Sequence, residues 1–192
     1  MNYQDYIWDL GGTLLDNYET STAAFVHTLQ DFGLTGSHDE VYKALKVSTD
    51  YAVRQFAPGN KEFLKSYKAN EAKELEHPIL FEGASELLAQ IIQQGGRNFL
   101  ISHRDDQVLE ILQKTQISAY FTEVVTATNG FKRKPDPESM LYLKDKYQIE
   151  SGLVIGDRPI DTEAGQAAGF SCYLFDNMRN LEEFVDIELE KE

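Results

Sequence analysis

The sequence contains a single cysteine, Cys172, so no disulfide bond can form within the chain. Long apolar runs are also missing, since no stretch approaches the roughly 20 residues that a membrane-spanning helix needs. The first residues, from Met1 to Asp5, contain neither the basic start nor the apolar stretch of a secretion signal. These absences together predict a cytoplasmic protein in a reducing compartment.

Positive charge is scarce as well. Lys and Arg number 18 against 32 Asp and Glu, which gives a formal net charge of −14. Nucleic acids and anionic membranes require basic surfaces, so we expect neither as a partner. A small phosphorylated ligand is compatible with this charge, because a few local cations can outweigh the overall field. The acidic end from Glu182 to Glu192 is expected to be a solvated, frayed tail.

The apolar content is sufficient for one core domain with a modest insertion, since 42% of the 192 residues are hydrophobic. Residues 17–78 show helical patterns and no convincing strand. The expected helices cover 20–32, begin at Ser37 in a capping box with Glu40, and open at Asn60 with Phe63, Leu64 and Tyr67 on one face. This segment therefore forms an all-helical unit.

After Pro78 the pattern alternates between helices and short apolar strands. One helix carries an apolar stripe from Ala84 to Ile92, and the expected strands lie near 3–8, 98–101, 124–125, 153–155 and 172–175. Such alternation is typical of a parallel sheet covered by helices on both faces. The predicted fold class is α/β, with a Rossmann-like parallel-sheet core from residues 1–16 and 79–192 and a small all-helical domain from 17–78.

Polar side chains follow four of the predicted strands, where ligands gather in open α/β sheets. These residues are Asp9, Ser102, Lys134 and the pair Asp157 and Asp161. The Ser102 hydroxyl and the backbone N–H groups after it could hold a phosphoryl oxygen, and Lys134 would supply a fixed positive charge. The three aspartates would make an oxygen-rich site suited to Mg²⁺.

Each of these residues also has a purely structural explanation. Ser102 could cap a helix, Lys134 could be a solvated charge in a basic loop, and the aspartates could be turn or N-cap residues. All of them together, in this order along the chain, are much harder to explain in that way.

The motifs resemble those of the haloacid dehalogenase-like superfamily, in the branch with a helical cap inserted after the first motif. The matching segments are Asp9 to Asp16, Ile101-Ser102, Lys134 to Pro137, and Gly156 to Asp161 with the small residues that follow, and they span nearly the whole chain. The layout is similar to that of phosphoglycolate phosphatases and β-phosphoglucomutases, which implies a small phosphorylated substrate.

The resemblance also implies a role for each site residue. Asp9 would be the nucleophile that becomes an aspartyl phosphate, and Ser102 and Lys134 would bind the phosphoryl group. The implied Mg²⁺ ligands are Asp9, the main-chain carbonyl of Gly11, Asp157 and Asp161, and the implied substrate-binding residues are Gly12, His103 and Arg104. A monomer or a homodimer is expected.

The sequence departs from the family pattern at Gly11, where phosphatases carry the aspartate that protonates the leaving group and then activates water. The candidates for a substitute acid and base are His103, Tyr18, Glu19 and His27. Two other hypotheses stay open: a phosphonatase-like C–P hydrolase that uses Lys43 or Lys46 as a Schiff-base amine, and a catalytically weak protein that binds a phosphorylated metabolite or a protein partner. Arg104 and Arg158 flank the site and are candidates for binding a second anionic group.

Overall fold

The computed structural model describes residues 3–189, with side chains described as far as residue 185. It divides into two compact units: a core unit, made of the chain up to Leu15 and from Leu80 onward, and a helical unit over Asp16–Ile79. The sequence analysis expected these divisions at 16/17 and 78/79, each one residue away from those of the structure at 15/16 and 79/80.

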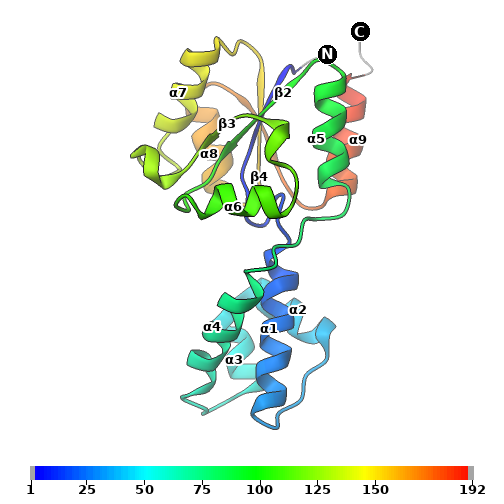
Figure 1. Cartoon of the computed structure of the whole chain (residues 1–192), viewed down its shortest axis with the longest axis vertical. Coiled ribbons are helices and arrows are strands. Elements are labelled where there is room, and N and C mark those ends of the chain that lie inside the picture. The colour runs from blue at the N-terminus through cyan, green and yellow to red at the C-terminus, as the bar shows by residue number, and fades with distance from the viewer. Residues whose placement is uncertain (1–2, 190–192) are drawn as a thin grey trace. The chain divides into compact units, whose positions relative to one another are not determined.

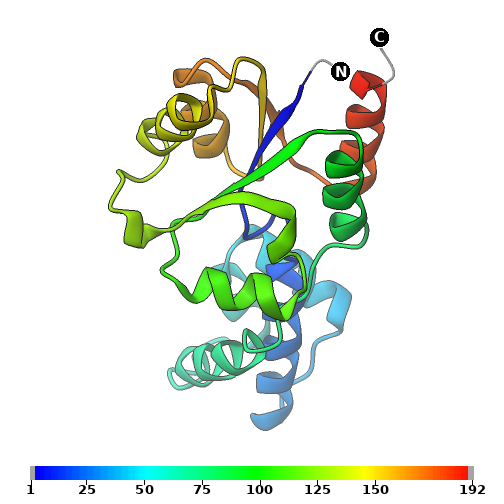
Figure 2. The same cartoon turned by 45° about the horizontal axis from the view of Figure 1, so that its top comes forward.

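The core unit is built on a five-stranded parallel sheet, which confirms the predicted α/β, Rossmann-like class (Figures 1 and 2). The strands are β1 (Asp5–Trp8), β2 (Arg97–Ile101), β3 (Phe121–Val125), β4 (Gly152–Gly156) and β5 (Ser171–Leu174), in the order β3-β2-β1-β4-β5. Trp8 at the end of β1 lies opposite Leu100 of β2 and Ile155 of β4. The residue that follows β1 is therefore at the middle of the carboxyl edge of the sheet.

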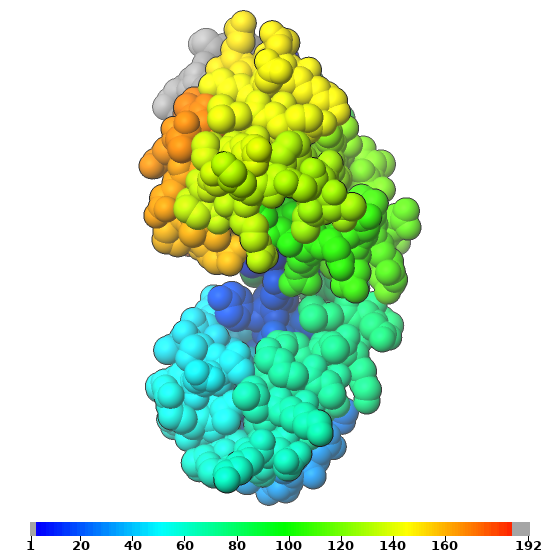
Figure 3. All heavy atoms as spheres, turned by 90° about the vertical axis from the view of Figure 1, so that its left-hand side faces the viewer, coloured from blue at the N-terminus to red at the C-terminus, as the bar shows by residue number. Residues whose placement is uncertain are grey.

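Alternate residues of each strand face opposite sides of the sheet, as the period of two in a β-strand requires. Tyr6 and Trp8 pack with α5 (Ala84–Gln93), α6 (Gln107–Lys114) and α9 (Met178–Leu189). Ile7 and Phe99 pack on the other face with α7 (Glu138–Tyr147) and α8 (Pro159–Ala167) (Figure 1). Two short 3₁₀ turns, Ser118–Tyr120 and Ala127–Asn129, flank β3. In the space-filling view of Figure 3, α7 and the loop before it cover the near side of the core unit.

Two details of the core unit differ from the sequence prediction. Ile92 was expected in the buried stripe of α5 but is 41% exposed. The acidic segment was expected to be a frayed tail from Glu182 onward, but it is helical as far as Leu189. Leu181 and Val185, four residues apart, are buried on one face of α9 and hold it on the sheet. The last three residues of the predicted tail lie outside the described part of the chain.

A buried hydrogen bond links the two central strands next to the site. The Trp8 indole Nε1 donates to Asn98 Oδ1 at 2.9 Å, and the Asn98 amide nitrogen donates to the Leu88 carbonyl at 3.1 Å. Trp8 is 1% exposed and is the single tryptophan of the chain. Its fluorescence will therefore report on the core unit alone.

The helical unit consists of α1 (Asn17–Asp31), α2 (His38–Val47), α3 (Thr49–Phe56) and α4 (Phe63–Glu74). The capping box between Ser37 and Glu40 is present, as predicted. The sequence analysis missed α3, which follows α2 directly because Ser48 ends one helix and caps the next. Leu64 was expected on the apolar face of α4 but is 40% exposed, whereas Phe63 and Tyr67 pack edge-on against Phe25.

Glu71 of α4 joins two helices of this unit. Its carboxylate accepts hydrogen bonds of 2.7 Å from Ser21 of α1, from Tyr67 and from Lys68. Burial raises the pKa of Glu71, but these three donors outweigh burial and the pKa is lowered overall.

The chain passes from the core unit to the helical unit and back through two adjacent segments. Leu15 and Leu80 form an antiparallel β-bridge. The Phe81 N–H donates to the Leu14 carbonyl at 2.9 Å, and the Asp16 N–H donates to the Ile79 carbonyl at 2.9 Å. Among the described residues, no helix is both long enough and apolar enough to cross a membrane.

Candidate active site

Asp9 extends the β1 ladder by one residue, since its N–H donates to the Ile155 carbonyl at 2.9 Å. The chain then turns sharply: the Leu10 carbonyl accepts hydrogen bonds from the N–H groups of Leu14 and Leu15. Gly12 has φ +82°, and a Cβ there would lie 2.4 Å from Asp157 Oδ2. Only glycine can adopt this conformation cheaply and also leave room for the carboxylate.

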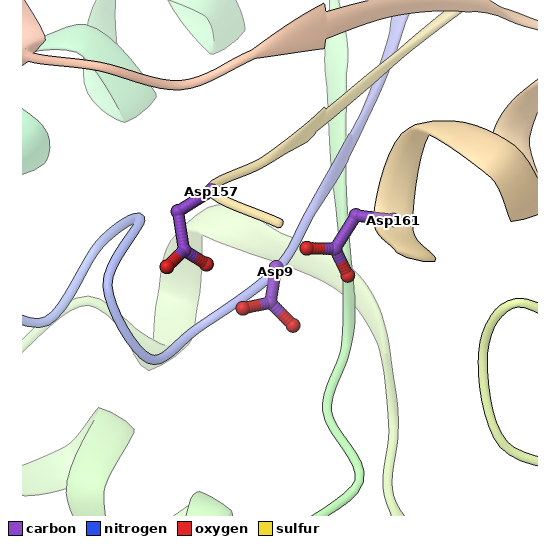
Figure 4. Close-up of side chains that lie close together, drawn as sticks. All are labelled: Asp9, Asp157 and Asp161. Atoms are coloured by element: carbon purple, nitrogen blue, oxygen red, sulfur yellow. The ribbon is translucent and has the colours of Figure 1, made fainter. Parts of the chain in front are cut away.

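Three carboxylates, those of Asp9, Asp157 and Asp161, point toward one another (Figure 4). One oxygen from each lies within 4.8 Å of the others. Asp9 follows β1 and Asp157 follows β4. Asp161 lies in the first turn of α8, where its Oδ2 accepts a hydrogen bond of 3.1 Å from the Arg158 N–H. The helix start therefore fixes the third carboxylate.

Lys134 lies against two of these carboxylates. Its Nζ is 2.5 Å from Asp9 Oδ1 and 2.5 Å from Asp161 Oδ1, and it also donates to the Ile101 carbonyl at 3.4 Å. The Lys134 and Asp161 side chains are each 1% exposed. The Lys134 ammonium therefore holds the Asp9 carboxylate in place beside that of Asp161.

The cluster carries more negative charge than Lys134 can balance. Burial raises the pKa of Asp9, while the Lys134 ammonium acts in the opposite direction. Burial, followed by the charges of Asp9 and Asp161, raises the pKa of Asp157 to about 6. Asp157 Oδ1 is buried and accepts no hydrogen bond from any described residue. An unpartnered carboxylate oxygen beside two other carboxylates is the donor set that Mg²⁺ prefers, so the residues fit this ion.

The backbone at Gly11 is compatible with the role that the resemblance implies. No described residue donates a hydrogen bond to the Gly11 carbonyl. Gly11 is also not among the described glycines with positive φ, so another residue could adopt its backbone conformation.

Ser102 and His103 follow β2 at the same edge. Ser102 is 5% exposed, and its hydroxyl oxygen accepts a hydrogen bond of 3.3 Å from the Arg104 N–H. His103 Nε2 accepts a hydrogen bond of 2.7 Å from the Lys134 N–H. His103 thus connects the loop after β2 to the lysine that contacts Asp9.

The same bond argues against His103 as the substitute acid or base. Burial lowers the pKa of His103 to about 4, and the charges of Lys134, Arg133 and Arg158 act in the same direction. The ring is therefore neutral near pH 7, with its proton on Nδ1 because Nε2 is an acceptor. Because Nε2 of the neutral ring accepts a hydrogen bond and carries no proton, it cannot protonate a leaving group.

The other candidates from the sequence lie in the helical unit, and each has a partner there. Tyr18 packs edge-on against Tyr42, Glu19 Oε1 lies 2.8 Å from His38 Nε2, and the 57% exposed His27 lies 3.8 Å from Asp31. Lys43 and Lys46 are both exposed, and the Lys46 ammonium lies over the Tyr42 ring.

A cavity of about 220 Å³ lies beside Ser102, between the ends of β2 and β3. Its lining includes Ser102, His103, Lys132, Arg133 and Ser139, and no acidic residue among those that the structure describes. The backbone of Arg104 passes beside it, since the Arg104 carbonyl accepts from the Ala127 N–H at 2.8 Å. Sequence reasoning named Lys134 and missed its neighbour Arg133, although the run Lys132-Arg133-Lys134 carried the signal.

Comparison with known proteins identifies the chain as a phosphatase-type hydrolase, and its fold is of the α/β class. The chain belongs to the haloacid dehalogenase-like hydrolase family, whose model matches residues 6–175. This confirms the resemblance that the four motifs indicated.

Individual relatives agree with this family. A solved structure of a hydrolase from Streptococcus pneumoniae TIGR4 is 70% identical, with a TM-score of 0.93 over 97% of this chain and 100% of that chain. The phosphoglycolate phosphatase of Aliivibrio fischeri is 28% identical over 88% of this chain and 81% of its own length. A putative pyrophosphatase PpaX of Caldanaerobacter subterraneus is 25% identical over 85% of this chain and 77% of its own length.

Proposed function

We propose that this protein is a Mg²⁺-dependent phosphohydrolase that acts on a small phosphorylated metabolite through an aspartyl phosphate on Asp9. The observation that supports this most directly is the placement of Asp9, which follows the central strand and lies beside Lys134 and two further carboxylates. Relatives named for phosphoglycolate and pyrophosphate are consistent with a small substrate.

The proposed chemistry assigns a task to each side chain. An Asp9 carboxylate oxygen attacks phosphorus, and Lys134 and Ser102 hold the phosphoryl oxygens during the attack. Asp9, Asp157, Asp161 and the Gly11 carbonyl would hold Mg²⁺, which would neutralise charge at the phosphoryl group. His103 positions the Lys134 backbone, and Gly12 leaves space for Asp157. The helical unit acts as the substrate-selecting cap.

Gly11 sets the expected kinetics. General acid–base catalysis contributes about 10²–10⁴-fold, and glycine has no side chain to provide it. Poor leaving groups should therefore react slowly, and hydrolysis of the aspartyl phosphate should be slow enough for it to accumulate.

The test is the mass of the intact protein after brief incubation with acetyl phosphate and Mg²⁺, followed by acid quench. Wild type should carry a phosphoryl adduct that Asp9→Asn does not form. In Gly11→Asp the adduct should be short-lived, because the new carboxylate can activate water. An equal adduct on Asp9→Asn would show that Asp9 is not the acceptor, and the proposal would fail.

A second candidate function is suggested by Gly11 itself. A protein that retained the metal and phosphate residues but lost the acid could bind a phosphorylated metabolite without turning it over. Absence of an adduct on wild type, with turnover appearing in Gly11→Asp, would favour this function. The phosphonatase-like alternative needs a desolvated amine, and the exposure of Lys43 and Lys46 gives it no support.

A further inference from the structure

The arginines of the core unit fall into two groups. Arg97 and Arg179 each pair with a carboxylate, those of Asp5 and Glu183. No described carboxylate lies within ion-pair distance of Arg104, Arg133 or Arg158. These three follow β2, β3 and β4, so all of them lie at the carboxyl edge of the sheet. In a chain of net charge −14, unpaired arginines gathered at one edge are a feature to explain.

Two of these arginines are neighbours of site residues in the sequence, since Arg158 follows Asp157 and Arg133 precedes Lys134. The Arg158 N–H is bonded to Asp161, which fixes the backbone from which its exposed side chain extends. Its charge acts on both Asp9 and Asp157. Arg133 immediately precedes Lys134 and lines the cavity beside Ser102 and His103. The charges of both arginines lower the pKa of His103.

The chemistry at Gly11 indicates what such charges would do. An alkoxide leaving group resembles hydroxide in being a strong base, so it needs a proton as it departs. A carboxylate leaving group has a conjugate acid with a pKa of roughly 4.3 and departs as an anion. A site without an acid but with unpaired arginines is therefore suited to leaving groups that are anions.

We propose that the substrate is an acyl phosphate or another phosphoanhydride, and that Arg158 and Arg133 stabilise its departing anion in place of the missing acid. This inference rests on the proposed function and narrows its substrate class. An Asp9 oxygen forms a bond to phosphorus while the bond from phosphorus to the leaving oxygen breaks. The leaving oxygen keeps the electron pair and takes no proton.

The second half-reaction also balances without a side chain at residue 11. Water oxygen bonds to phosphorus, the bond from phosphorus to Asp9 breaks, and the Asp9 carboxylate regains its electron pair. The proton that water loses passes to the phosphate product or to solvent. This step is unassisted and is therefore the slow one.

The test compares two substrates of nearly equal size, acetyl phosphate and ethyl phosphate, which differ in the leaving group. Wild type should hydrolyse acetyl phosphate and react poorly with ethyl phosphate. Gly11→Asp should raise kcat/KM for ethyl phosphate by about 10²–10⁴-fold, because it restores an acid.

The arginines are tested with acetyl phosphate, by the rate of adduct formation on Asp9. Arg158→Gln and Arg133→Gln should each slow it about tenfold, which is less than the 10²–10³-fold loss of a buried donor because both side chains are exposed. Arg158→Lys should recover part of the rate. The matched control is Arg179→Gln, on α9 of the same unit, which should form the adduct at the wild-type rate. Added salt should slow wild type more than Arg158→Gln.

Failure of this inference can be separated from failure of the proposed function. Asp9-dependent hydrolysis of ethyl phosphate that is as efficient in wild type as in Gly11→Asp would overturn the substrate class alone. Equal rates in Arg158→Gln, Arg133→Gln and Arg179→Gln would overturn the role of the arginines. No Asp9-dependent reaction with either compound would overturn both proposals.

Discussion

Replacing Lys134 by methionine should destabilise the core unit far more than the loss of a surface lysine. The Lys134 ammonium lies 2.5 Å from both Asp9 and Asp161, with side chains 1%, 7% and 1% exposed. Methionine is similar in length, so it fills the space but removes the charge. Two carboxylates are then left buried without their cation, a change that costs about 3–5 kcal/mol when one partner of a buried pair is removed.

The matched control is Lys146→Met. The Lys146 ammonium lies 2.8 Å from Glu123, but it is 47% exposed. Pairs of this kind contribute about 0–1 kcal/mol. The two substitutions therefore remove the same charge from the same unit, and they differ in burial.

The assay is urea unfolding followed by Trp8 fluorescence, near pH 7.5 and in EDTA, because Trp8 reports on the core unit. Added Mg²⁺ should reduce the difference in free energy of unfolding between Lys134→Met and wild type, since the ion supplies the positive charge that the ammonium no longer provides. If Lys134→Met lowers the free energy of unfolding by less than about 1 kcal/mol, as Lys146→Met is expected to do, the reasoning is refuted.

Two further predictions concern a glycine and a glutamate. Gly12→Ala should weaken Mg²⁺ binding, measured by calorimetry, at least tenfold, because the new Cβ would displace the Asp157 carboxylate. This is roughly the loss of affinity seen when the support of a metal ligand is disturbed. The control is Gly33→Ala, where φ is +65° and a Cβ meets open space, and it should bind Mg²⁺ as wild type does. The lowered pKa of Glu71 means that its stabilisation of the helical unit is complete above about pH 4.5 and is lost as pH falls through the folded value. In thermal melts followed by circular dichroism, acidification should lower the stability of Glu71→Gln less than that of wild type. An equal loss of stability in the two proteins would contradict this.

The sequence predicted the fold class and the edge of the sheet that carries the site. Both depend on local signals, because short apolar strands alternate with helices and polar residues follow four of the strands. Asp9, Ser102 and Lys134 could therefore be placed at one edge before their contacts were known. The clustering of their side chains follows from the parallel topology.

Contacts between distant segments could not be predicted. The pairing of Lys134 with Asp161 depends on where α8 begins, and the bond from the Lys134 N–H to His103 depends on how two loops meet. The many carboxylates near the carboxyl end led to the prediction of a solvated tail. The segment is instead helical, because Leu181 and Val185 are buried against the core unit. Apolar spacing likewise gave no sign that Ile92 is exposed.

The antiparallel bridge between Leu15 and Leu80 has a consequence for how the gene can be edited. The two ends of the 16–79 segment meet side by side, with hydrogen bonds on both sides of the junction. A short turn could therefore join Leu15 to Leu80 without stretching the core chain, because a hairpin closes with as few as about two residues. The helical unit is in this sense a removable module. Another insert whose ends lie equally close could be exchanged for it while the sheet and its carboxyl edge stay intact.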